Sequence, residues 1–233
     1  MGDAIQTPSR GTSIHNHGGR EYDPLRNTID KYIQENSANG DDLIGLRDSF
    51  GNGGVLLGLV DWLAASFDES NSGGIDYIGG PEAGAGVLCG AFMMRLNPNP
   101  EARRKIGHIR IMKYADEKDV PEGFESRKYP TGRVVKKPDG SEEPEYKILA
   151  VHRGCIKQPP KKVILIDDWA ETYRQLSTCA DLLELQGADV VGAATIVSIQ
   201  DGRADFEKAH PRTRPLLSLL DYERLGDRSL RRI

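Results

Sequence analysis

The pattern of hydrophobic and polar positions predicts helices that alternate with short buried strands. After a polar segment at 1–22, which we expect to be a flexible arm, apolar side chains recur every three or four positions from Leu25 to Ile33. A second apolar stretch at 55–67 follows a glycine-rich break and predicts another helix. A short strand at 75–78 then leads through glycines into a small-residue helix at 87–96.

The second half of the chain has the pattern of a strand, a helix and a strand joined by short links. Apolar runs at 163–166 and 190–199 flank an amphipathic helix at 172–185, which ends just before Gly187. Runs without alternation are typical of parallel strands that helices cover on both faces. A right-handed crossover between such strands predicts an α/β fold with an open parallel sheet and flanking helices.

Residues 97–147 interrupt this pattern. They hold six of the 13 prolines and many charges, and only 106–112 resembles a strand. Because long irregular segments in compact domains are usually disordered or functional, we expect a mobile lid at about 115–147. The basic, proline-interrupted tail at 201–233 predicts a small C-terminal hood, with Arg224 on a solvated or dimer-facing surface. The α/β domain itself then spans 23–200.

Composition and charge exclude several classes of function. Hydrophobic residues make up 38% and charged residues 28%, and no apolar run approaches the roughly 18 residues that a spanning helix needs. The formal charge of −4 argues against nucleic-acid binding, which favours a basic surplus. The first residues lack the apolar segment of a secretory signal, and the widely spaced Cys89, Cys155 and Cys179 fit reduced thiols. We therefore expect a cytoplasmic protein that binds neither membrane nor nucleic acid.

The chemistry concentrates in the segment 163–176, VILIDDWAETYRQL. Asp167 and Asp168 follow a buried strand and precede a helix, at the edge where open α/β sheets bind ligands. The helix N-terminus offers free backbone N–H groups to a phosphate, and paired carboxylates suit Mg²⁺ or sugar hydroxyls. The alternative is that one aspartate caps the helix and the other is solvated.

This arrangement of strand, acid pair, loop and helix resembles the phosphoribosyl diphosphate (PRPP) signature of the type I phosphoribosyltransferases. Other segments resemble the adenine phosphoribosyltransferase branch: 46–48 beside the base, 75–90 at the phosphates, 109–121 as a basic strand, 145–146 in the hood, and 218–222 at the end. The resemblance covers roughly 40–225 and is most specific at 163–199. It implies that family's fold with a mobile hood, and Mg²⁺-dependent transfer of a phosphoribosyl group to a purine base, in a homodimer.

The resemblance also implies roles for individual residues. Asp167 and Asp168 would hold the ribose and, directly or through water, Mg²⁺. The 5′-phosphate would lie against Glu171, Thr172, Tyr173, Arg174, Gln175 and Leu176, and the pyrophosphate against Glu82, Ala83, Gly84 and Lys113. Leu46, Arg47 and Trp169 would contact the base, although an aromatic residue after a strand commonly packs in a core. The proton on the purine would be handled by Glu145, Tyr146 or Glu171.

Two parts of the site depart from the family pattern. Tyr173 and Arg174 stand where the phosphate loop has glycines, whose missing Cβ lets the backbone approach a phosphate. Arg174 either replaces that contact with its guanidinium, or points to solvent while Tyr173 closes the site. Gly84 stands where the family has an arginine, so anion affinity would come from Arg47, Lys113 or the insertion.

These departures leave three functions open. Glu171, an acid where adenine-specific members have an apolar residue, is either a candidate acid/base or a first-turn helix acid, and it leaves the base undetermined. The first function is a purine phosphoribosyltransferase that converts a base, adenine-like in the first place, and PRPP to a nucleoside 5′-monophosphate and pyrophosphate. The second is a specialised transferase that acts on an unusual base. The third is a regulator that binds PRPP or a nucleotide without turnover.

Overall fold

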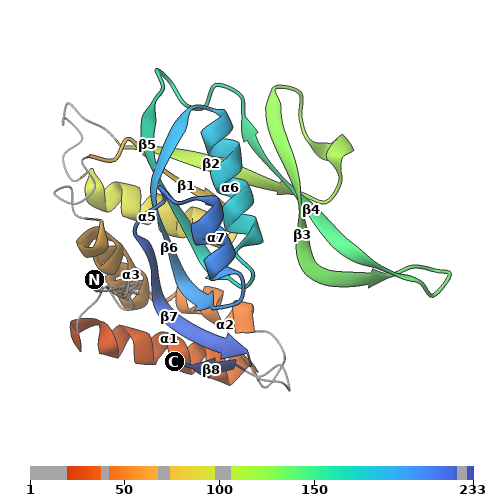
Figure 1. Cartoon of the computed structure of the whole chain (residues 1–233). Helices are drawn as coiled ribbons and strands as arrows, with labels where there is room; N and C mark the ends of the chain where they lie inside the picture. The colour runs from red at the N-terminus through yellow and green to blue at the C-terminus, as the bar shows by residue number, and fades with distance from the viewer. Residues whose placement is uncertain (1–19, 38–41, 68–73, 98–105, 225–229) are drawn as a thin grey trace, which may run out of the picture.

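A computed structural model of the chain describes residues 20–37, 42–67, 74–97, 106–224 and 230–233. Its centre is one sheet of eight strands in the order β3-β4-β2-β1-β5-β6-β7-β8 (Figure 1). The strands are β1 (Tyr77–Pro81), β2 (Gly107–Tyr114), β3 (Phe124–Lys136), β4 (Glu142–His152), β5 (Lys161–Ala170), β6 (Ala188–Ile199), β7 (Leu216–Arg224) and β8 (Leu230–Arg232). The helices are η1 (Arg20–Tyr22), α1 (Asp23–Ser37), α2 (Asp42–Ser49), α3 (Gly53–Ser66), α5 (Gly84–Leu96), η2 (Glu117–Asp119), α6 (Arg174–Leu185) and α7 (Arg203–Ala209).

The middle of the sheet is parallel, as the sequence predicts. The strands β2, β1, β5, β6 and β7 run in one direction, whereas β4 pairs antiparallel with β2 at one side and β8 antiparallel with β7 at the other. The sheet is therefore mixed at its edges, and the parallel strands all present their carboxyl ends to the same side of the molecule.

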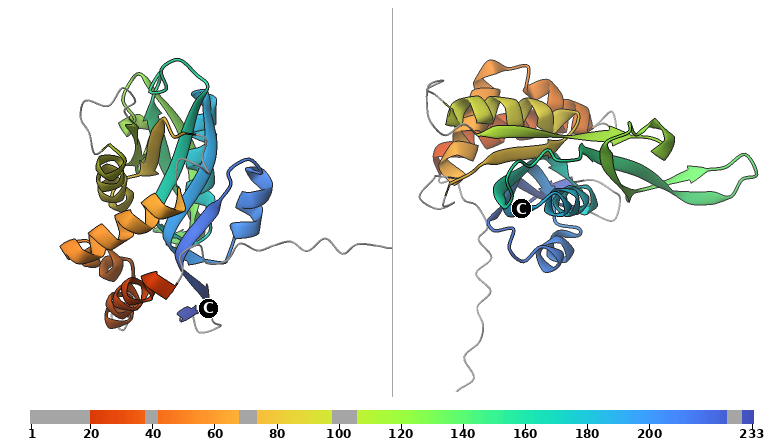
Figure 2. Two further views of the ribbon diagram at one scale, coloured as in Figure 1. Left: turned by 90° about the vertical axis from the view of Figure 1, so that its left-hand side faces the viewer. Right: turned by 90° about the horizontal axis from the view of Figure 1, so that it is seen from above.

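Helices cover both faces of this sheet (Figure 2). The helices α1, α3 and α5 lie over one face, and α6 and α7 lie over the other. Ile164 and Ile166 of β5 belong to the hydrophobic cluster on the first side, and Val163 and Leu165 belong to the cluster on the second. Because both faces of β5 are buried, its apolar run shows no alternation.

The segment at 115–147, expected as an irregular lid, contains ordered strands instead. After η2, most of it belongs to a long antiparallel hairpin of β3 and β4, which projects from the body of the molecule (Figures 1 and 2). Residues 133–136 on β3 and 142–144 on β4 are exposed. This outer part of the hairpin buries little surface and needs no alternating apolar face, which is why the sequence pattern did not predict it; at the base of the hairpin, residues 148–151 of β4 are buried.

The tail at 201–233, expected as a hood, completes the central sheet. After α7, β7 pairs in parallel with β6, and Leu216, Leu217, Leu219 and Leu220 are buried. The interruption at Pro211 and Pro215 lies in the link before the strand and does not break it. The α/β domain thus extends past residue 200.

Other expectations concern the ends of the chain, membranes and cysteines. The expected arm at 1–22 lies outside the described residues up to residue 19, and its last three residues form η1. Within the described ranges, no helix combines the length and the apolar content needed to cross a membrane. All three cysteines are free thiols in this structure.

Candidate functional site

A pocket with a volume of about 680 Å³ opens at the carboxyl ends of β1, β2 and β5. The hairpin β3–β4, the end of α2 and the start of α6 supply the other walls. This is the edge at which open α/β sheets bind ligands. The pocket is lined by Arg47, Glu82, Ala83, Lys113, Tyr114, Ala115, Tyr129, Pro130, Thr131, Arg133, Glu145, Lys147, Asp167, Asp168, Trp169, Ala170, Glu171, Thr172, Tyr173, Gln175 and Leu176.

Two adjacent carboxylates of β5 line this pocket and are almost fully buried. Asp167 is 1% exposed and Asp168 is 4% exposed. Asp167 Oδ1 accepts a hydrogen bond from the Asp168 backbone N–H at 2.9 Å, and Asp167 Oδ2 accepts one from the Gln175 amide at 2.9 Å. Burial, and then the neighbouring charge of Asp168, raise the pKa of Asp167 well above its ordinary value. The pair therefore favours a bound cation or hydrogen-bond donors beside it.

The Asp168 carboxylate is held by an arginine from a distant part of the chain. Arg47 Nε donates to Asp168 Oδ2 at 2.9 Å, across 121 residues of sequence. Gly84, the first residue of α5, lies directly against this pair. A Cβ at position 84 would lie 1.6 Å from Asp168 Oδ2 and 2.9 Å from Arg47 Nε. The ion pair thus occupies the space that any side chain at position 84 would need.

The turn between β5 and α6 keeps a glycine-like backbone although it contains a tyrosine. Tyr173 has φ 57° and ψ 0°, the left-handed conformation that glycine adopts most readily. Its side chain is 2% exposed, its hydroxyl hydrogen-bonds to Ser198 Oγ at 2.6 Å, and its ring lies 5.9 Å from that of Phe206. The ring therefore anchors the turn in the core and does not close the pocket.

The start of α6 is open to a ligand. No side chain caps this helix at Tyr173, and the first N–H groups of an α-helix have no partner within the helix. Arg174, the first helical residue, is exposed and does not line the pocket. The backbone and dipole of the helix N-terminus, and not the Arg174 guanidinium, thus face the pocket as a place for an anion.

Hydrogen bonds connect the hairpin to the acid pair. The Tyr129 hydroxyl donates to Gln175 Oε1 at 2.8 Å, and the amide nitrogen of the same Gln175 donates to Asp167. Across the hairpin, the Thr131 hydroxyl donates to Glu145 Oε2 at 2.6 Å. The hairpin is therefore a wall of the site and not a detached arm.

Basic and acidic side chains share the pocket. Lys113 is half-buried on β2; burial lowers its pKa, and the charge of Asp167 opposes that shift. Arg133 and Lys147 add two further cationic groups from the hairpin. Glu171 pairs with Arg224 of β7, which is exposed and does not itself line the pocket.

The structure brings most of the residues named from the sequence into this one pocket, but four of them lie elsewhere. Leu46 is fully buried in the core and is not part of the pocket lining, so its contact with the base stays a prediction. Tyr146 is 44% exposed on β4 with the Lys128 ammonium 4.4 Å from its ring centre, outside the lining. Arg174 points away, as described above, and Gly84 lies behind Asp168.

Several residues of the hairpin and of neighbouring strand ends line the pocket although the sequence interpretation did not select them. They are Tyr114 and Ala115 at the end of β2, Tyr129, Pro130, Thr131 and Arg133 on β3, Lys147 on β4, and Ala170 at the end of β5. The available signal was weak, because alternate positions 129, 131 and 133 share one face of a strand only if the strand is recognised first. Trp169 both lines the pocket and packs against the core, which joins its two expected roles.

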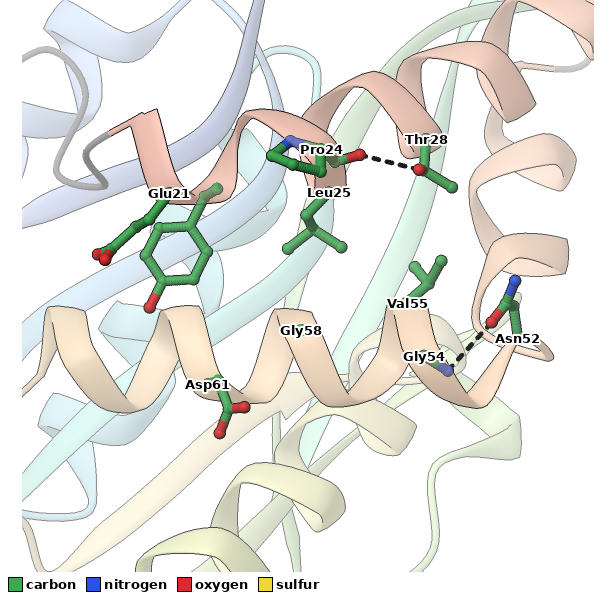
Figure 3. A pocket seen from close by; sticks show the side chains of 10 residues that line it. Glu21, Pro24, Leu25, Thr28, Asn52, Gly54, Val55, Gly58 and Asp61 are labelled. Carbon is green, nitrogen blue, oxygen red and sulfur yellow. Dashed lines mark hydrogen bonds between the residues drawn. The ribbon is translucent and has the colours of Figure 1, made fainter.

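A second cavity, of about 550 Å³, lies between α1 and α3 (Figure 3). Its lining includes two acids, Glu21 and Asp61, and no basic side chain. The hydrogen bonds within it are local to each helix, from Thr28 to the Pro24 carbonyl and from the Gly54 N–H to Asn52. Because no basic side chain is among the residues that line this cavity, it does not favour an anion, and the pocket at the sheet edge is the candidate site.

Comparison with solved structures shows that the chain has the type I phosphoribosyltransferase fold, which adenine phosphoribosyltransferases also have. No protein-family profile matches the sequence. The enzyme from Thermoanaerobacter pseudethanolicus superposes with a TM-score of 0.57 at 17% identity, over 76% of this chain and 86% of that one. The fold predicted from the sequence is thereby confirmed.

Two further structures with the same fold carry ligands. The enzyme from Giardia lamblia, complexed with 9-deazaadenine, superposes with a TM-score of 0.55 at 18% identity, over 76% of this chain and 84% of that one. The enzyme from Trypanosoma brucei, in complex with AMP, pyrophosphate and ribose-5-phosphate, superposes with a TM-score of 0.53 at 17% identity, over 76% of this chain and 68% of that one. At these identities the likeness establishes the fold.

Proposed function

We propose that this protein is a Mg²⁺-dependent phosphoribosyltransferase that joins a purine base to PRPP and releases pyrophosphate. The observation that carries the proposal is the buried pair Asp167 and Asp168 beside the uncapped start of α6, in one pocket. A sugar phosphate needs both features, because its hydroxyls bind carboxylates and its phosphate binds free N–H groups. Structures with the same fold are complexed with adenine or with AMP and pyrophosphate, which supports the same substrates for this chain.

Each part of PRPP would lie against a different group of residues in the pocket. The ribose hydroxyls would donate to the Asp168 carboxylate, which Arg47 holds at the pocket through Oδ2. The 5′-phosphate would accept from the backbone N–H groups at 172–175. The pyrophosphate would lie toward Ala83 and Lys113, with Lys147 and Arg133 as further cationic groups.

The donor set at the acid pair fits Mg²⁺. This cation prefers carboxylate oxygens and keeps several of its waters, and burial has left Asp167 with an unfavourable charge that a cation would stabilise. Asp168 and Asp167 would hold the ion, directly or through its water. When bound, the ion would neutralise negative charge on the departing pyrophosphate.

The remaining residues would orient the reactants and move one proton. The bond from C1′ to pyrophosphate loosens, the sugar gains oxocarbenium character, and a base nitrogen attacks C1′. The hairpin wall at Tyr129 and Thr131 would exclude water from that centre, and Trp169 offers the base an aromatic surface. Glu145 or Glu171 would accept the proton that the purine loses, since both side chains line the pocket.

The decisive experiment is a pyrophosphate-release assay with PRPP, Mg²⁺ and a panel of free bases. Release with one purine is the expected result and identifies the base; release with a non-purine alone would favour the specialised transferase. No release with any base, while PRPP still raises the melting temperature, would refute turnover and favour the regulator.

The matched variants test the acid pair. In Asp168→Asn, turnover should fall on the order of 100-fold or more, since one charged group at the reacting sugar is lost. The melting temperature should change little, because the lost pairing with Arg47 is offset by relief of repulsion with Asp167. Asp189→Asn, at the opposite end of β6, is the control and should keep full turnover. Full activity of Asp168→Asn would overturn the proposed role.

A further inference from the structure

The helices α6 and α7 lie side by side on one face of the sheet (Figure 1). A cluster of possible metal ligands lies between them, away from the pocket. Asp181 and Glu184 are three positions apart on α6 and therefore lie on one face of the helix. His210 is the residue that ends α7, and its side chain is 3% exposed. One ligand atom from each of the three lies within 4.8 Å of the others.

The imidazole of His210 has one nitrogen in use and one without a partner. Its Nε2 lies 2.8 Å from Ser177 Oγ, a hydrogen bond that occupies this nitrogen. Its Nδ1 is buried and has no hydrogen-bond partner within the described part of the chain. The nearest acid atom to it, Glu184 Oε1, is 3.8 Å away, which is too far for a hydrogen bond. A buried polar atom without a partner is costly, so this nitrogen points to a ligand.

We propose that His210, Asp181 and Glu184 form a binding site for a zinc ion. In the zinc-bound form, Nε2–H would donate to Ser177 Oγ, and the Nδ1 lone pair, 3.8 Å from Glu184 Oε1, would bind the ion; metal-bound histidines are commonly oriented in this way. Imidazole nitrogen together with carboxylate oxygen favours zinc over magnesium or calcium, which take oxygen ligands. A water molecule would be the fourth ligand.

The geometry needs only small movements of exposed side chains. Tetrahedral zinc with bonds of about 2.0 to 2.1 Å places its ligand atoms roughly 3.3 Å apart. Glu184 Oε1 lies 3.8 Å from His210 Nδ1 and Asp181 Oδ1 lies 3.9 Å from Nε2, and the two acidic side chains are 37% and 45% exposed. Rotation of these two side chains would therefore bring their oxygens to bonding distance, while the buried imidazole stays in place.

An ion at this site would fasten α7 to α6. The ring of Phe206 lies 4.9 Å from His210 and 5.9 Å from Tyr173, so the site is packed against the residue that anchors the turn before α6. A zinc ion that binds the folded chain but not the unfolded chain stabilises the folded state by mass action. The site is separate from the acid pair and does not depend on the proposed transferase activity.

The test is a zinc titration of the full chain, purified without a histidine tag and treated with a chelator. The chain is used as a His15→Ala/His17→Ala variant, so that the two histidines near the start do not bind the added metal. Zinc is added alone and binding is followed by competition with a chromogenic chelator and by the melting temperature. One zinc ion per chain and a higher melting temperature are expected.

Three further variants separate the site from adventitious binding. Asp181→Asn/Glu184→Gln keeps side-chain size and should weaken zinc binding at least ten-fold and abolish the rise in melting temperature. Ser177→Ala should weaken binding by about ten-fold, as loss of a partner of a ligating histidine does. Asp205→Asn, an exposed acid on α7 outside the cluster, should leave binding unchanged. Absence of stoichiometric zinc, or equal affinity in Asp181→Asn/Glu184→Gln, would overturn the proposal.

Discussion

Replacement of Tyr173 by glycine tests how the turn before α6 is built. The variant restores the residue type that its φ of 57° favours, and left-handed backbone costs a non-glycine residue roughly 1 to 2 kcal/mol. The same change removes a ring that is 2% exposed and packs against Phe206. Loss of a buried aromatic side chain costs about 3 to 5 kcal/mol, so the ring outweighs the strain.

We therefore expect Tyr173→Gly to lower the free energy of unfolding by roughly 1 to 4 kcal/mol. For a chain of this size, each kcal/mol shifts the melting temperature by about 2 to 4 °C. The assay is thermal or urea unfolding followed by circular dichroism. A melting temperature equal to or above that of the unmodified chain would refute the reasoning, because it would show that the backbone strain exceeds the contribution of the ring.

Two companion variants divide the effect. Tyr173→Phe keeps the ring but leaves the buried Ser198 hydroxyl without its partner, and should cost about 1 to 3 kcal/mol. Tyr173→Asn keeps a residue that tolerates left-handed backbone and loses the ring, so it should resemble Tyr173→Gly. Arg174→Gly is the neighbouring control; its side chain is exposed, and the expected cost is only about 0.5 to 1 kcal/mol.

Two further predictions concern buried groups, a glycine beside the acid pair and two cysteines. Gly84→Ala should disrupt the Arg47–Asp168 pair and cost about 1 to 3 kcal/mol, since its Cβ would lie 1.6 Å from a carboxylate oxygen. Gly86→Ala, with nothing within 4 Å of its Cβ, is the matched control; equal melting temperatures for the two would contradict the close approach. Iodoacetamide at neutral pH should leave Cys89 and Cys179 unmodified, because burial excludes the reagent and raises their pKa, and peptide mass spectrometry that finds either one modified in the native chain would contradict this burial.

The sequence alone determined the central parallel strands and the acid pair. Val163, Ile164, Leu165 and Ile166 alternate between two buried faces, so every position is apolar and the strand is recognisable without knowledge of its neighbours. The acids at its end, and the helix after them, lie within a few residues of the strand. The sequence of elements within this short segment was therefore enough to place the two acids at the ligand-binding edge of a sheet.

The hairpin and the last central strand were decided by tertiary structure. Most of β3 and the first half of β4 are exposed, and their regularity comes from cross-strand hydrogen bonds, which leave little trace in the hydrophobic pattern. β7 is apolar enough to predict a strand, but its partner β6 is set by the crossover through α7. Which strands pair depends on two segments of the chain, so the sequence of one strand does not specify its partner.

The finer structure of the site also required the fold. Arg47 reaches Asp168 across 121 residues, and Tyr173 adopts a glycine-like backbone because its ring has a buried place beside Ser198 and Phe206. The sequence showed only that a family arginine and two glycines were missing. Whether such a change erodes a site or is accommodated depends on the space and partners that distant residues provide, and these exist only once the chain is folded.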